Sequence, residues 1–204
     1  MDWGNASDLA SAGCNIVMAS AAVYAAFNAK RWFSQRSHTK GFDKAEEILT
    51  QIDSLFRETV DGITELHTTL EFLNTVSGNL TLADHSLMEK YECLASNHNN
   101  LIQNIDRLSE EVELIERWSI KIKNQHIIHS TIKAFRYTHV SASHAYNAAR
   151  GAIYDINFMS KEDFEIMLKH YKKFYEEFLY ELAEAELQYG NFKKQKFTSF
   201  FKVN

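Results

Sequence analysis

The feature that most constrains this chain is a stretch of 21 residues, 9–29, that contains no charged side chain. As a helix it would be about 32 Å long, close to the roughly 30 Å hydrocarbon core of a bilayer. The charged residues before it are all acidic, whereas Lys and Arg supply the first four charges after it. These are Lys30, Arg31, Arg36 and Lys40. Because cytoplasmic flanks of membrane helices are enriched in Lys and Arg, we predict a transmembrane helix over 9–29 with its N-terminus outside.

A buried helix of a soluble domain is the alternative for this stretch, because Ala, Ser, Gly and Asn dilute its apolar character. The aromatic residues Trp3, Tyr24 and Trp32 favour the membrane, since amphipathic rings concentrate at the two interfaces of a bilayer. A cleaved signal peptide fits poorly, because no Lys or Arg precedes the apolar run. The predicted location is therefore the plasma (inner) membrane, crossed once.

Small and polar residues follow one face of this predicted helix at spacings of three and four. They are Ser11, Asn15, Ala19, Ala22 and Ala26. Small side chains let helix backbones approach each other, and an Asn within the membrane seeks a hydrogen-bonding partner on a neighbouring helix. The face predicts self-association into a homo-oligomer, unless these residues are merely tolerated there.

The rest of the chain reads as helical throughout. Apolar residues recur at steps of three and four over 42–76, 82–120, 126–157 and 161–200, with no proline to interrupt them. Ser160 is placed to cap the last of these segments toward Asp163. Residues 79–150 contain neither Gly nor Pro, so the two middle segments could also form one long rod. Their matching lengths favour a turn near 121–125.

We therefore predict an all-α protein, in which a single transmembrane helix precedes an elongated antiparallel bundle of four helices, or of three with one very long middle helix. The predicted regions are a short extracytoplasmic N-terminus (1–8), the membrane helix (9–29), a basic juxtamembrane hinge (30–41), the cytoplasmic bundle (42–192) and a basic, aromatic tail (193–204). Residues 41–192 carry 14 Lys and Arg against 25 Asp and Glu. This acidic middle argues against a nucleic-acid partner.

The basic ends of the chain suit the anionic surface of a lipid bilayer. The residues predicted to contact the membrane surface are Lys30, Arg31, Arg36, Lys193, Lys194, Lys196, Phe197, Phe200 and Phe201. In the tail, lysines would attract headgroups while Phe rings insert at the acyl boundary. The alternative is that these Phe rings cap the core of the bundle.

No motif for catalysis or for cofactor binding stands out. His126 and His129 lie three residues apart, but the chain has no HExxH motif and no acidic residue three positions before a His, the spacing of di-iron bundles. We expect no cofactor and no metal, with His98, His126 and His129 at polar core positions or at a helix break. The absence of Gly-rich phosphate loops and of GxSxG also argues against an enzyme.

Two hypotheses for function follow. The first is a non-enzymatic anchored adaptor or scaffold, which holds an unidentified soluble protein partner at the membrane through its acidic bundle. The second is an effector that oligomerises and perturbs the bilayer, by analogy with small membrane proteins of bacterial toxin and antiviral (phage) defence systems.

Overall fold

The computed structural model describes residues 6–78, 84, 86–118, 120–158 and 160–203, and helices dominate it. The prediction of an all-α protein is confirmed. The helices are α1 (Ala6–Gly78), α2 (Ser86–Leu114), η1 (Ile115–Trp118), α3 (Gln125–Phe158), α4 (Lys161–Lys193) and α5 (Phe197–Phe200). Two short strands, β1 (Ile120–Ile122) and β2 (Phe201–Val203), pair with each other.

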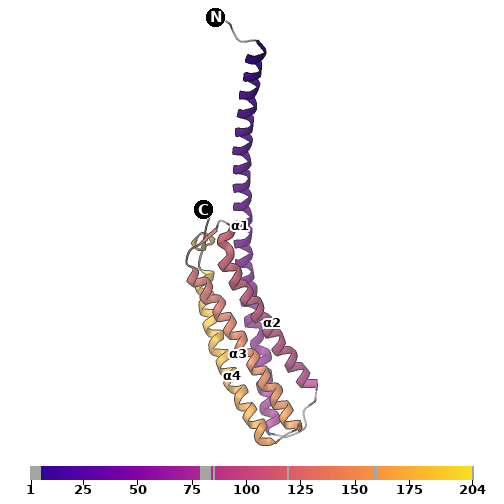
Figure 1. Cartoon of the computed structure of the whole chain (residues 1–204). Coiled ribbons are helices and arrows are strands. Elements are labelled where there is room, and N and C mark those ends of the chain that lie inside the picture. The colour runs from indigo at the N-terminus through magenta and orange to yellow at the C-terminus, as the bar shows by residue number, and fades with distance from the viewer. Residues whose placement is uncertain (1–5, 79–83, 85, 119, 159, 204) are drawn as a thin grey trace.

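Helix α1 is continuous for 73 residues, or about 110 Å. Its first part projects alone from the molecule, and its second part packs in a four-helix bundle (Figure 1). The predicted hinge at 30–41 is therefore wrong, because these residues are helical. The reason is local: this segment has no proline, and its Ser, Gln, Arg, Thr and Lys residues cost little in a helix.

Gly41, at the end of the predicted hinge, instead permits a close approach between two segments. A Cβ at this position would collide with the backbone oxygen of Trp118 and would lie 2.8 Å from Cγ1 of Ile120. The residue is buried within α1. Gly41 thus lets the segment between α2 and α3 pack directly on the long helix.

Helices α2 and α3 are separate, as the four-helix prediction required. α2 ends at Leu114, and the connection through η1 and β1 closes at Asn124, where φ is 49°. Asn tolerates this left-handed conformation better than most residues. The turn thus falls where predicted, although no pattern in the sequence indicated a strand within it.

The Ala-rich helix α3 is the central element of the bundle, since it packs on α1, α2 and α4. Ala145 and Ala149 are fully buried, and small side chains at these positions leave room for aromatic rings from neighbouring helices. One such ring is that of Tyr171 on α4, whose hydroxyl donates a hydrogen bond of 2.6 Å to the carbonyl oxygen of Leu66 on α1. This hydrogen bond ties α4 to α1 inside the core.

The core has two parts that follow one another along the bundle. The part beside the projecting helix includes Ile48, Ile105 and Phe135, and it is closed at its end by η1, β1, α5 and β2. The remote part includes Leu66 and Tyr146. The chain ends on the same side as the projecting part of α1, so the tail lies next to the base of that helix (Figure 1).

Candidate functional site

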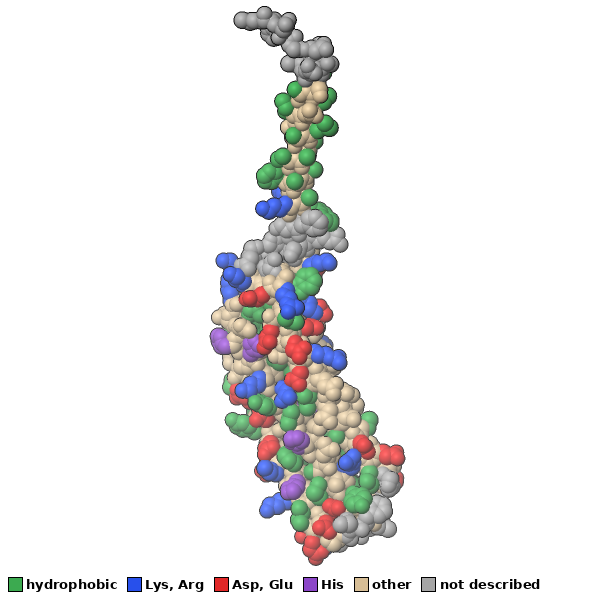
Figure 2. Space-filling view, viewed as in Figure 1, with side chains coloured by type: hydrophobic (Ala, Val, Ile, Leu, Met, Phe, Trp, Pro, Cys, Tyr) green, Lys and Arg blue, Asp and Glu red, His purple; other side chains and the backbone are tan. Residues whose placement is uncertain are grey.

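The projecting part of α1 is the first candidate site. Residues Ala10–Trp32 form a helix of 23 residues that is long and apolar enough to cross a membrane, and none of it is buried inside the molecule. Large side chains on it stand in the open: Ile16 is 67% exposed and Phe27 71%. Apolar side chains cover this rod, and basic side chains mark its base (Figure 2). The alternative of a core helix is excluded within the described part of this chain, because nothing there covers it.

The predicted small-residue face lies on this uncovered helix. All five of its side chains are exposed, namely Ser11, Asn15, Ala19, Ala22 and Ala26. Among the described residues, none forms a side-chain hydrogen bond with Asn15. An amide that must find its partners outside the chain is costly in hydrocarbon unless a second helix supplies them. The geometry therefore leaves this face available for association between helices.

The predicted basic residues gather where the projecting helix meets the bundle. Lys30 and Arg31 are exposed at the end of the apolar span, and the side chain of Arg36 lies outside the described residues. Lys193, Lys194 and Lys196 are exposed at the end of α4 and just beyond it. The fold thus brings the basic tail close to the basic residues that follow the apolar stretch.

The tail phenylalanines are placed differently from our prediction. Phe200 is 2% exposed and Phe201 4%, so neither can insert into lipid in this structure. The ring of Phe200 stacks on that of Phe192 at 5.1 Å between centroids, and the half-buried Phe197 lies 4.6 Å from the ring of Phe42. The alternative, in which these rings cap the core, is the one observed.

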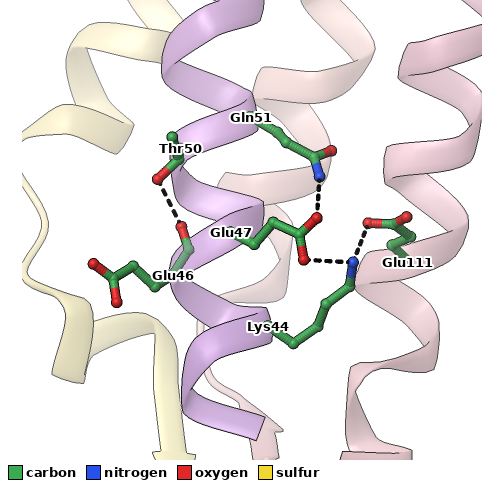
Figure 3. Close-up of polar contacts among 6 residues, drawn as sticks. All are labelled: Lys44, Glu46, Glu47, Thr50, Gln51 and Glu111. Carbon is green, nitrogen blue, oxygen red and sulfur yellow. Dashed lines mark hydrogen bonds and ion pairs between the residues drawn. The ribbon is translucent and has the colours of Figure 1, made fainter. Parts of the chain in front are cut away.

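A polar cluster just below this end links α1 to α2 (Figure 3). The Lys44 ammonium lies 2.9 Å from carboxylate oxygens of both Glu47 and Glu111. Partial burial lowers the pKa of Lys44, but the hydrogen bonds and charges of the two carboxylates outweigh this effect and raise the pKa above its ordinary value. The hydrogen bond from Lys44 lowers the pKa of Glu47. Lys44 is therefore a neutralised cation, in contrast to the lysines of the tail.

A buried pair of histidines forms the second candidate site. His98 on α2 is 8% exposed and His139 on α3 is 1% exposed. Their Nδ1 atoms are 2.9 Å apart, and Nε2 of His139 lies 3.2 Å from the hydroxyl of Thr59 on α1. Three helices thus contribute to one polar chain inside an apolar core.

The hydrogen bonds of this pair determine which nitrogen carries each proton. The Thr59 hydroxyl donates to the carbonyl oxygen of Leu55 at 2.7 Å, so it accepts from Nε2–H of His139. Nδ1 of His139 is then unprotonated and accepts from Nδ1–H of His98. A further proton on His139 would face the N–H of His98 and break this bond. Burial lowers the pKa of His98 to about 4, and burial together with the charge of His98 lowers that of His139 to about 3.

The sequence pointed to half of this pair. His98 occupies a position in the apolar stripe of its helix and is buried, as expected. His126, which is exposed, and His129, which is half-buried, lie at the start of α3, next to the expected helix break. Nothing local to His139 indicated that it would meet His98. Among the described residues, no three His, Cys, Asp or Glu side chains lie close enough together to hold a metal ion.

Comparison with known proteins adds no relative. No family model, curated protein or solved structure matches this chain. Its function is therefore inferred from its own residues.

Proposed function

We propose that this protein is a non-enzymatic, single-pass membrane protein that acts as an anchored adaptor or scaffold. The observation that carries the proposal is the uncovered apolar helix Ala10–Trp32. Exposing such a surface to water is unfavourable, at roughly 25 cal/mol for each Å² of apolar area. A bilayer removes this cost along the whole length of the helix, and the bundle remains in water.

The proposed orientation places the bundle in the cytoplasm of a cell with its N-terminus outside. It is supported by Lys30 and Arg31, which immediately follow the apolar span, and by the further lysines of the tail on the same side. An excess of Lys and Arg near a membrane helix marks the cytoplasmic flank.

The proposed soluble partner would bind the side of the bundle. Support comes from α4, where the ring of Tyr180 is 72% exposed and the side chain of Leu187 58% exposed. These positions are seven residues apart and so share one face of the helix, with the exposed Glu177 and the half-buried Glu184 at neighbouring positions. Large apolar side chains within an acidic surface suit a protein partner with apolar and basic groups.

Membrane fractionation tests the proposal directly. We expect the full-length protein to sediment with membranes and to stay there after washes with high salt and with alkaline carbonate, which release proteins held only by charge. Detergent should release it. Recovery in the carbonate supernatant would refute the anchor, whereas recovery in the pellet after detergent would indicate aggregation rather than membrane insertion.

A second candidate function is an effector that oligomerises in the bilayer and perturbs it. The observation in its favour is the small-residue face, which has no partner within the described chain, and above all Asn15. If this candidate is right, overproduction should depolarise the membrane, whereas an adaptor should leave the membrane potential unchanged.

Crosslinking in membranes tests the self-association on which the effector depends. Asn15→Leu should weaken crosslinking while favouring insertion, because a hydrogen bond between membrane helices contributes roughly 0.6–2 kcal/mol. Ala22→Leu should weaken it by bulk alone, and Val17→Leu, on the opposite side of the helix, is the matched control. Equal crosslinking of all three variants and the parent would leave the helix as a simple tether and would remove the main support for the effector.

A further inference from the structure

We propose that the end of the bundle beside the projecting helix is a docking surface for anionic lipid headgroups. This surface, which we name the basic collar, consists of side chains from η1, β1, the end of α4 and the tail. Its members are Arg117, Lys121, Lys123, Lys193, Lys194, Lys196 and Lys202. The inference rests on the proposed membrane anchor and adds the chemistry of the lipid that the bundle recognises.

The collar is assembled by strand pairing between segments about 80 residues apart in the chain. β1 and β2 run antiparallel, and Lys121 lies directly opposite Lys202. Ile120 and Phe201, which directly precede the two lysines, are buried in the core. Because successive side chains of a strand point to opposite faces, both lysines point outward. Like charges directly opposite each other destabilise a strand pair. An anionic surface placed over the two lysines would relieve this repulsion.

The basic side chains of the collar are unpaired, unlike many of those elsewhere in the bundle. Among the described residues, ion pairs neutralise six cations elsewhere in the bundle, namely Lys44, Lys90, Arg136, Arg150, Lys161 and Lys173. In contrast, no collar side chain forms an ion pair with any residue that the structure describes. Segments 115–124 and 193–203 contain a single acidic residue, Glu116. The collar therefore presents a concentrated positive charge on an otherwise acidic bundle.

The helix between the apolar span and the bundle keeps the collar within a short distance of the membrane. Trp32 ends the apolar span, and Gly41 touches Trp118 and Ile120 at the end of the bundle. Nine residues of helix separate these two levels, which is about 14 Å. The headgroup layer occupies roughly 5–8 Å of this distance. The remaining gap of roughly 6–9 Å is comparable to the Debye length of about 8 Å at physiological salt, before the reach of a lysine side chain is counted.

The partner that this position favours is a lipid surface rather than a nucleic acid. The collar faces the same side as the apolar helix, so a bilayer that contains this helix lies directly opposite the lysines (Figures 1 and 2). A nucleic acid would have to enter the narrow space between the bundle and the membrane.

Energy transfer from the collar to lipid headgroups tests the inference on the full-length protein. A donor fluorophore is attached to Thr198→Cys, an exposed position between Lys196 and Lys202, after Cys14→Ala and Cys93→Ser remove the native thiols. The protein is reconstituted in vesicles of phosphatidylcholine, alone or mixed with phosphatidylglycerol, that carry an acceptor on a few headgroups. We expect stronger transfer in the anionic vesicles, and high salt should abolish the difference.

The decisive comparison is between two double variants that remove the same charge. Lys121→Gln with Lys202→Gln should lower the ratio of docked to undocked protein in anionic vesicles roughly 25-fold, because each lysine near an anionic surface contributes about fivefold. Lys169→Gln with Lys172→Gln is the control, since both lysines are exposed, lack an ion pair in the described structure and lie on α4 toward the remote end of the bundle. Circular dichroism checks that both variants fold.

Equal transfer in the two kinds of vesicle, or equal losses in the two double variants, would overturn the inference. So would a preference of the protein for single-stranded RNA over anionic vesicles. Failure of the anchor itself has a different signature, because the parent would then not float with vesicles of phosphatidylcholine alone. In that case, flotation of the parent with anionic vesicles that is lost in Lys121→Gln with Lys202→Gln would still support the collar. If the parent did not float with anionic vesicles either, both proposals would be overturned.

Discussion

Arginine in place of Val17 is expected to move most of the protein from the membrane to the soluble or aggregated fraction. Val17 lies near the middle of the apolar span and is 68% exposed, so no group of the described chain can cover or neutralise an arginine there. A charge at the centre of a membrane helix costs about 2.5–3.5 kcal/mol on insertion scales, which corresponds to roughly 100-fold in the ratio of inserted to non-inserted protein. The measurement is carbonate extraction of membranes, followed by quantification of pellet and supernatant.

Two controls separate insertion from folding in this experiment. Val17→Leu keeps the position apolar and should remain in the carbonate pellet. Leu187→Arg introduces the same charge at an exposed apolar site of the bundle and should also remain there. The bundle should keep its helical content in Val17→Arg, because no residue of the apolar span is buried against it. Retention of Val17→Arg in the carbonate pellet at the level of the parent, in a form that detergent releases, would contradict a membrane-spanning role for this helix.

The elements that the sequence predicted correctly are those that local periodicity specifies. Steps of three and four predicted all four bundle helices, and the cap at Ser160 is observed, where its hydroxyl accepts from the backbone N–H of Asp163 at 3.2 Å. Such features depend on neighbours along one helix, which the sequence displays directly.

The features that the sequence missed depend on partners far along the chain. A phenylalanine beside lysines has the same local pattern whether it enters lipid or a core, and the stacking of Phe200 on Phe192 decides between the two. Gly41 looked like a hinge because its close neighbours Trp118 and Ile120 are remote in sequence. Lys121 belongs to an acidic region by composition, and strand pairing alone places it beside Lys202.

Acid is expected to destabilise the bundle through the buried pair His98 and His139. Burial lowers the pKa of His98 to about 4, and burial with the charge of its neighbour lowers that of His139 to about 3. In the unfolded chain each histidine takes up a proton as the pH falls through about 6.5. Between these values the unfolded state binds more protons than the folded state, so the free energy of unfolding falls as the pH falls. Above pH of about 7 the pair is neutral in both states and contributes no pH dependence.

The expected slope is steep because two histidines titrate together. Where both are protonated in the unfolded chain and neutral in the fold, the free energy of unfolding falls by up to about 2.7 kcal/mol for each pH unit. Urea denaturation of the detergent-solubilised protein, followed by circular dichroism from pH of about 7 to about 5, measures this slope. His98→Gln with His139→Gln should flatten it, since an amide donates and accepts hydrogen bonds but does not titrate in this range.

The matched control for this prediction is His126→Gln with His170→Gln, which removes two exposed histidines and should leave the slope as in the parent. The readout is the change in stability with pH rather than stability itself, because the Gln pair would also alter packing around Thr59 and Tyr146. Carboxylates contribute to acid unfolding as well, but their charges are the same in all three proteins. If the His98 and His139 variant loses as much stability between pH of about 7 and about 5 as the parent does, the buried pair is not the source of the acid sensitivity.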